Sequence, residues 1–372
     1  MSSSTNTLVK RLVVSATLAG VIAGIALLLV ARGGTTPQPA AQVRPWHKLP
    51  AAPVKLDQPS TSVWTGKELI VFGRRVVTAL DSRGAPYVVK SIDVAEAYDP
   101  ASQKWTRLGP PTGPGYEPNY NAVWTGKDAL VFAPFRSLAY NPATKTWRTL
   151  RKWVGGGLVV WTGREAIGWG GGCCGDAFGN GLAYNPATDT YRQLAPSPLA
   201  PSQGPIGAWT GRELVLFSSG FNPAEGKLFP GSLARGAAYN PAANTWRRIT
   251  PLPSSKLGSG GAAAWDGHEV LIAGYGSNAR AAFAYDPATN RRRALAPMPF
   301  GLRAARAFWA EDRLLVWGGS ETGRGLAYDP RSNRWSVLPA APLAGFPEAL
   351  AWTGHGLIVA TGVHAAAFTP PS

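Results

Sequence analysis

The stretch GLVVWTGREAIGW at residues 157–169, followed by LAYNPATDTY at residues 182–191, determines the fold. A short apolar run ends in Trp161, and Thr-Gly then turns the chain, since glycine adopts positive φ freely. A second apolar strand follows, and a third ends at Tyr184. Asn185-Pro186 begins another tight turn, because Pro presets φ at about −65° and the short polar side chain caps the turn backbone. The stretch therefore predicts a unit of four short antiparallel strands.

Both marks of this unit recur along the chain. The Trp that precedes the first turn occurs seven times, as Trp64, Trp124, Trp161, Trp209, Trp265, Trp309 and Trp352. The aromatic residue before the second turn also occurs seven times, as Tyr98, Tyr140, Tyr184, Tyr239, Tyr285, Tyr328 and Phe368. Four-stranded repeats of about 40–50 residues are typical of β-propeller blades. Two independent marks with the same count predict seven blades.

The pattern resembles the Kelch family over residues 43–372. The resemblance implies an all-β propeller, although the Gly-Gly pair that usually ends the second Kelch strand is clear only at Gly170-Gly171 and Gly318-Gly319. It also implies that the two kinds of repeat turn lie on one face of the ring. The loops between strands two and three, and those between blades, then lie on the opposite face. We expect Asn244 and its counterparts Asn290 and Asn333 to end their turns in the left-handed conformation.

The two ends of this region are expected to close the ring together. The last unit stops at Phe368–Ser372 and lacks a fourth strand. Residues 43–49 (VRPWHKL) match the fourth strand of another unit, TWRTL at residues 146–150. We expect residues 43–49 to complete blade seven with residues 348–368, because a ring closed by both termini leaves no open sheet edge.

The composition agrees with many short strands. The 372 residues include 44 Gly, 33 Pro and 15 Trp, and they are 45% hydrophobic but only 16% charged, which is too apolar for disorder. The net charge of +16 would suit anionic lipid head groups, cell-wall polymers or acidic glycans, or simply favour solubility. The basic residues are scattered among the repeats, so we expect no nucleic-acid partner.

The N-terminal segment predicts a membrane anchor. Residues 12–31 contain no charged side chain, and twenty helical residues span about 30 Å of hydrocarbon. Lys10 and Arg11 precede them, which keeps residues 1–11 cytoplasmic. A cleaved signal peptide is the alternative, but its apolar region is usually shorter and ends in an A-x-A-like site. We expect an uncleaved single-pass signal anchor of a bacterial cytoplasmic membrane, a tether over residues 32–42, and an extracytoplasmic propeller at residues 43–372.

Function is sought in the variable loops, because the repeat turns are nearly identical between blades and are interpreted as structural. Three such loops stand out, at residues 73–95, 170–181 and 218–236. Arg, Glu and Tyr side chains at the channel mouth would suit a sugar or a carboxylate, although ordinary hydrogen bonds between blades are the alternative. The candidate ligand-binding residues are Arg303, Arg306, Glu117, Tyr120, Glu348 and Asp176.

Cys173 and Cys174 are the only cysteines of the chain. In an oxidising compartment they could form a vicinal disulfide, which is strained because neighbouring Cα atoms lie closer together than in ordinary disulfides. Such a ring could contact a ligand or be redox-active. The alternatives are a bridge that only holds the loop in place and two free thiols.

Catalytic constellations are sparse. The four His residues are dispersed, so the sequence predicts no metal site, no cofactor and no catalytic set. We therefore expect a non-catalytic module that binds a protein, a glycan or an anionic envelope polymer. One alternative is a sugar-acting enzyme, by analogy with Kelch-type sialic acid mutarotases and galactose oxidase, with Arg303, Arg306, Glu117 and Glu348 as candidates. A structural scaffold is the third possibility.

Overall fold

The computed structural model describes the chain from residue 46 to residue 369, with gaps at 110–120, 134–135, 152–155, 173–175, 219–233, 254–260, 275–279, 320–322 and 344–348. The predicted anchor and tether lie outside the described residues. Within those residues no helix is long and apolar enough to span a membrane. Arg44–Ser372 forms a compact unit of its own and contains every strand described below.

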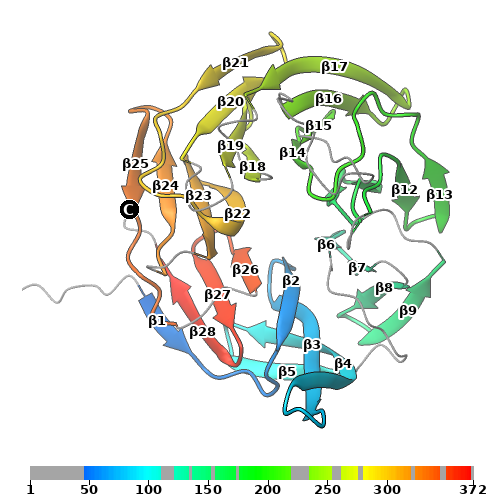
Figure 1. Ribbon diagram of the computed structural model, residues 1–372, viewed down its shortest axis with the longest axis vertical. Helices are drawn as coiled ribbons and strands as arrows, with labels where there is room; N and C mark the ends of the chain where they lie inside the picture. Colours follow the sequence, from blue (N-terminus) through cyan, green and yellow to red (C-terminus); the bar gives the residue numbers. More distant parts are fainter. Residues whose placement is uncertain are drawn as a thin grey trace, which may run out of the picture. The chain divides into compact units, whose positions relative to one another are not determined.

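Seven four-stranded antiparallel sheets form the blades of a ring, which confirms the predicted seven-bladed all-β propeller (Figure 1). Blade one consists of β2 (Gln58–Trp64), β3 (Leu69–Leu80), β4 (Pro86–Asp99) and β5 (Lys104–Leu108). Blade two consists of β6 (Asn121–Trp124), β7 (Ala129–Ala133), β8 (Arg136–Asn141) and β9 (Thr146–Leu150). Blade three consists of β10 (Leu158–Trp161), β11 (Ala166–Trp169), β12 (Gly181–Asn185) and β13 (Thr190–Gln193).

The remaining blades continue around the ring. Blade four consists of β14 (Ile206–Trp209), β15 (Leu214–Ser218), β16 (Ala234–Asn240) and β17 (Thr245–Leu252). Blade five consists of β18 (Gly261–Trp265), β19 (Val270–Gly274), β20 (Ala282–Asp286) and β21 (Arg291–Ala294). Blade six consists of β22 (Arg303–Ala310), β23 (Arg313–Gly319), β24 (Leu326–Asp329) and β25 (Arg334–Val337).

Blade seven is built from both ends of the propeller, as predicted. It consists of β26 (Ala349–Trp352), β27 (Leu357–Thr361), β28 (His364–Phe368) and β1 (Trp46–Leu49), in the order β1-β28-β27-β26. Trp46 pairs with Phe368, and its indole ring packs on Phe368 and Trp317 with ring centroids 5.1 and 5.2 Å apart. Its Nε1–H donates to the carbonyl of Pro339 at 3.0 Å. The N-terminal strand is therefore an integral part of the ring.

The strand registers place both kinds of repeat turn at the same end of each blade. In blade one, Trp64 pairs with Leu69, Leu69 with Tyr98, and Tyr98 with Trp105. The same row crosses every blade and reaches Phe368 and Trp46 in blade seven. We call this end of the ring the turn face and the opposite end the loop face.

The described core is divided among the interfaces between neighbouring blades. One cluster joins Phe72 of blade one to Val131 of blade two, for example, and another joins Leu69 to Ile358 of blade seven. Seven such clusters pair each blade with the next around the whole circle. The apolar second strand of each blade is buried on both sides, because it packs on two neighbouring blades. The ring thus supplies a rigid support for side chains on its two faces.

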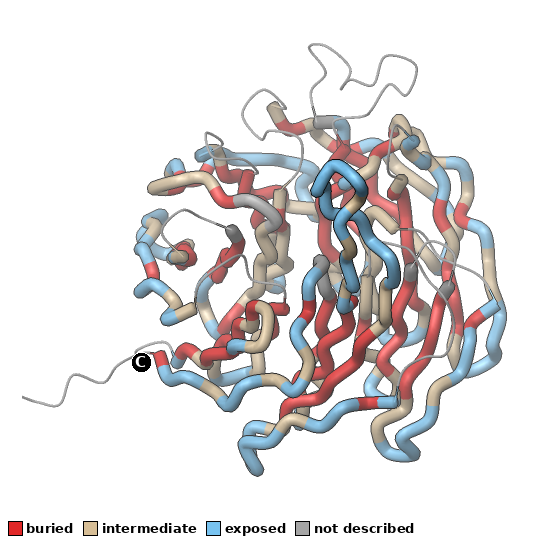
Figure 2. Tube along the Cα trace, turned by 60° about the horizontal axis from the view of Figure 1, so that its bottom comes forward, coloured by how far each residue is buried: buried red, intermediate tan, exposed pale blue. Residues whose placement is uncertain are grey.

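Blade one departs from the prediction of a variable loop at residues 73–95. β3 and β4 continue well beyond the blade as a paired hairpin, and only residues 81–85 form the connection. The prediction was wrong because the β-branched residues in this stretch continue the strand pairing. Arg74 and Asp93, opposite each other in this ladder, form an ion pair at 3.1 Å with Arg74 only 2% exposed. Figure 2 shows the hairpin as an exposed projection.

Candidate functional site: a groove on the turn face

The Thr-Gly turn of blade three holds two charged side chains in different environments. Thr162 Oγ1 accepts hydrogen bonds from the N–H groups of Arg164 at 3.3 Å and Glu165 at 2.9 Å, and it donates to the Glu165 carbonyl at 3.0 Å. Gly163 adopts φ of 90°, which a residue with a side chain rarely does. This geometry leaves Arg164 exposed and turns Glu165 toward the blade. Thr210 builds the same turn in blade four.

Glu165 belongs to a chain of side-chain hydrogen bonds that runs from blade three to blade four. Its Oε2 accepts from Arg192 Nη2 at 2.8 Å, and Arg192 Nη1 donates to the hydroxyl of Tyr239 and, at 2.9 Å, to Asn244 Oδ1. The Tyr239 hydroxyl donates to the same Asn244 oxygen at 2.6 Å. Burial lowers the pKa of Arg192, but its hydrogen bonds to Tyr239 and Glu165 outweigh burial and raise the pKa overall. Glu165 and Arg192 therefore neutralise each other within the fold.

Equivalent hydrogen-bonded side chains link three other pairs of neighbouring blades, each with an acid, an Arg, a Tyr and the last residue of the Pro turn. Burial raises the pKa of Tyr184 to about 12, against the opposing effect of the Arg148 guanidinium that donates to its hydroxyl at 2.8 Å. At the other three interfaces the position of the Arg is occupied by Thr106, Ser336 or His47. The three further chains are Asp128–Arg148–Tyr184–Asp189, Glu213–Arg247–Tyr285–Asn290 and Glu269–Arg293–Tyr328–Asn333.

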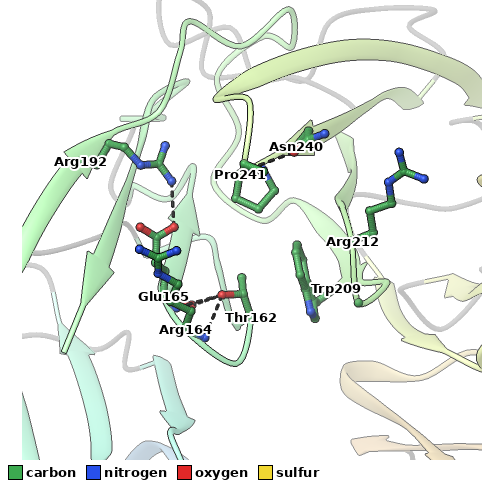
Figure 3. Close-up of a pocket in the computed structure, with 10 residues that line it drawn as sticks. Thr162, Arg164, Glu165, Arg192, Trp209, Arg212, Asn240 and Pro241 are labelled. Atoms are coloured by element: carbon green, nitrogen blue, oxygen red, sulfur yellow. Dashed lines mark hydrogen bonds and ion pairs between the residues drawn. The ribbon is translucent and has the colours of Figure 1, made fainter. Parts of the chain in front are cut away.

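A groove of about 670 Å³ opens on the turn face between blades three and four. It is lined by the Thr162–Glu165 turn, by Arg192, by Trp209 and the Arg212 turn, and by residues 240–242. Figure 3 shows Arg192 and Glu165 on one side of the groove and Trp209 with Arg212 on the other. The volume is that of a site for a small molecule or for part of a polymer. A half-buried Trp ring offers such a ligand a flat apolar surface.

The groove carries excess positive charge. Arg164 and Arg212 are exposed, and neither forms an ion pair with an acid among the described residues. The residue that caps the neighbouring Pro turn is Asn185 in blade three and Asn240 in blade four, where blades one, five and six have Asp. Since Glu165 is already paired with Arg192, the two exposed guanidinium groups keep their donors available for an anion.

The structure places two of the predicted ligand-binding residues in a strand rather than in a loop. Arg303 and Arg306 were expected between blades, but both lie in β22, which continues farther toward the loop face than predicted. Arg306 Nη2 donates to Thr61 Oγ1 of blade one at 3.4 Å, and burial lowers the pKa of its guanidinium. Arg306 thus joins the innermost strands of blades six and one. Nothing is described of the Arg303 side chain.

The described part of the structure does not bring the other predicted residues together into one site. Asp176 is exposed on the loop face of blade three, and its carbonyl accepts from Gln203 Nε2 at 2.7 Å. The predicted residues Glu117, Tyr120, Glu348, Cys173 and Cys174 lie outside the described residues. Within the described chain, no three His, Cys, Asp or Glu side chains gather closely enough to hold a metal ion.

The groove was missed by the sequence analysis, which interpreted the turn face as structural only. A signal was present in the repeats: an Arg follows the aromatic residue of the fourth strand only in some units, as in Tyr191-Arg192 and Trp246-Arg247. An Arg there could satisfy the acid of the Thr-Gly turn, leaving the preceding basic residue of that turn without a partner. The position of the Arg in the repeat did not predict its ion pair with the acid of the Thr-Gly turn. The Arg also donates to the Tyr of the next blade, and the repeat pattern does not show contacts between blades.

Comparisons with known proteins support the fold alone. No protein-family model matches the sequence, and no curated protein sequence matches it significantly. Among solved structures, the "Structure of YjhT" is similar with a TM-score of 0.53 and 15% identity over 78% of this chain and 99% of that one. A chain of the "Crystal Structure of Mitotic Checkpoint Complex" is similar with a TM-score of 0.60 and 13% identity over 94% of this chain and 99% of that one.

The fold therefore defines the class as a seven-bladed β-propeller. Membership of the Kelch family stays a prediction from the repeat pattern.

Proposed function

We propose that this protein is a non-catalytic binding module that holds an anionic ligand in the groove between blades three and four. The observation that carries the proposal is the pair of exposed arginines, Arg164 and Arg212, beside the ring of Trp209. Guanidinium groups bind carboxylate and phosphate with paired N–H donors, and an aromatic ring packs on the apolar face of a sugar. The ligand class is an acidic glycan or another carboxylate- or phosphate-bearing envelope polymer.

The proposed place of action is the outer side of a bacterial cytoplasmic membrane. The uncharged run at residues 12–31, preceded by Lys10 and Arg11, supports this proposal. A propeller held there by the predicted tether at residues 32–42 would meet the acidic polymers of the envelope directly. The excess of basic over acidic residues in the propeller would also attract such polymers over longer distances at low ionic strength.

Titration of the propeller with acidic polymers tests the proposal. Residues 44–372 would be titrated with polygalacturonate, polyphosphate and uncharged dextran, with binding followed by calorimetry. We expect at least one acidic polymer to bind and dextran not to bind. Replacing Arg164 and Arg212 by Gln should weaken binding about tenfold or more, since each loses charge-assisted hydrogen bonds.

The matched control replaces Arg83 and Lys90 by Gln. These exposed residues lie on the hairpin of blade one, and their replacement removes the same net charge from the loop face. The control variant should bind like the unmodified propeller. Equal weakening by both variants would mean that only net charge matters, and it would refute the groove as the site.

A further inference from the structure

Six of the seven Trp turns present a basic side chain at the same position. The residue two places after the turn Thr or Asp is basic in every blade except blade six, which has Asp312 there. All six basic side chains are exposed on the turn face: Lys67, Lys127, Arg164, Arg212, His268 and His355. Because the registers of all seven blades are equivalent, these side chains form a ring on one face.

Nearby carboxylates neutralise the positive charge of this ring in some blades and not in others. The N–H of Ala101 is the main cause that lowers the pKa of Asp99, and Lys67 lies close enough to lower it further. His268 similarly contributes to the lowered pKa of Asp286, whose main cause is the hydroxyl of Thr289.

Blades two, three and four have no carboxylate at the first position of the Pro turn, where Asp99 and Asp286 lie in blades one and five. Their Pro turns begin with Asn141, Asn185 and Asn240, and the acid of each Thr-Gly turn is paired with an Arg of its own blade. Uncompensated positive charge therefore gathers over these three blades. We call Lys127, Arg164 and Arg212 the basic arc.

The N-terminal part of the chain joins the propeller on the same face. β1 begins at Trp46, and the pairing of Trp46 with Phe368 places this end of the strand beside the turn face. Figure 1 shows β1 across the ring from the strands of blades three and four. Residues 32–45 separate the predicted anchor from β1 and reach at most about 50 Å when extended.

We propose that the turn face lies flat against the anionic headgroup surface of the membrane, with the basic arc in contact with the headgroups. This inference rests on the proposed function and adds the lipid headgroups as a second anionic partner of the face on which the groove opens. A planar anionic surface fits cations distributed over a flat ring better than a single small ligand does. The tether at blade seven and the basic arc across the ring would hold the face parallel to the membrane. The tether also raises the local concentration of headgroups.

Sedimentation with vesicles tests this inference. Residues 44–372 would be mixed with vesicles of phosphatidylcholine alone or of phosphatidylcholine with phosphatidylglycerol. We expect salt-sensitive binding to the anionic vesicles only, since each basic residue near an anionic surface contributes about a fivefold gain in partitioning. The triple variant Lys127→Gln, Arg164→Gln and Arg212→Gln should therefore partition about 100-fold less.

A matched control and a second readout keep the test specific. The control variant Arg75→Gln, Arg83→Gln and Lys90→Gln removes three exposed charges from the hairpin on the loop face and should still bind anionic vesicles. Hydrogen exchange of the vesicle-bound propeller should slow in residues 162–165 and 210–213 but not in residues 81–85. Slowing confined to the hairpin would overturn the proposed orientation.

The outcomes separate this inference from the proposed function. Binding to polygalacturonate or polyphosphate that depends on Arg164 and Arg212, without binding to anionic vesicles, would overturn the membrane contact and leave the groove function intact. Equal vesicle binding by the triple variant and the control would overturn the basic arc. A propeller that binds neither polymers nor vesicles would overturn both proposals.

Discussion

At the scale of single residues, the repeat turns show how one side chain can serve two purposes. Asn244, Asn290 and Asn333 adopt φ values of 51°, 55° and 51°, as the sequence predicted. Each also accepts a hydrogen bond from the hydroxyl of the Tyr five residues earlier. The backbone conformation was predictable because it depends on local sterics. The use of Asn244 as an acceptor for Arg192 was not, because Arg192 belongs to another blade.

Glu96 of β4 is an acid in an unfavourable environment. It is 2% exposed, and its Oε1 has no hydrogen-bond partner among the described residues. Burial raises its pKa to about 7, although the N–H of Val54 and the charge of Arg107 oppose this. A cavity of about 10 Å³ beside it, at the junction with blade seven, has room for about one water molecule.

The variant Glu96→Gln is expected to stabilise the protein at pH 8 but not at pH 4.5. The pKa of Glu96 is higher in the folded than in the unfolded protein, so its favourable contribution is complete below pH 4.5 and is lost as the pH rises through 7. The loss is on the order of 3 kcal/mol, which the amide avoids. Urea unfolding of both proteins across this pH range measures the difference. A stability difference that does not change with pH would contradict the assignment.

At the scale of elements, blade one differs from the other blades through its hairpin. Val76 pairs with Ser91, and the ladder continues to Leu80 and Pro86. The outer part exposes large apolar side chains: Val77, Leu80, Tyr87, Val88 and Val89 are 38–68% exposed. The inner part instead buries Arg74 against Asp93. The sequence analysis predicted a loop here because the other units have no equivalent segment.

Shortening this hairpin is expected to leave the fold intact. Residues 77–90 would be replaced by Asn-Gly, which suits a two-residue turn between paired strands. The melting temperature should change by only a few degrees, because the removed apolar side chains contribute little buried area. Asp93→Ala, in the retained part, should instead cost about 3 kcal/mol by leaving Arg74 buried without this carboxylate. Thermal unfolding compares the two variants, and a large loss on shortening would contradict the prediction.

At the scale of the whole molecule, the ring depends on its closure. The seven core clusters lie between blades, so each blade is stabilised by two neighbours. β1 covers the outer edge of β28 and brings Trp46 into the cluster shared by blades six and seven. Without β1, the outer blade edge would be open and this cluster would lose the indole ring that packs on Trp317 and Phe368.

A chain that begins at Arg44 should therefore behave differently from one that begins at Pro50. The first retains β1 and should melt close to the full chain. The second lacks β1, and we expect its melting temperature to fall by about 10 °C or more, since loss of a buried Trp alone costs about 3–5 kcal/mol. Scanning calorimetry and light scattering would measure stability and aggregation. Similar melting of the two chains would show that closure by β1 contributes little.

The sequence alone determined the number of blades, the four-strand unit, the turn conformations and the closure of the ring. These features follow from local sterics and from a pattern repeated within each unit. Only the tertiary structure decided which charges are neutralised, where the groove opens and on which face the N-terminal strand enters. Those features depend on side chains that meet across neighbouring blades, as Arg192 of blade three meets Tyr239 of blade four, and residues so far apart in sequence are paired only by packing.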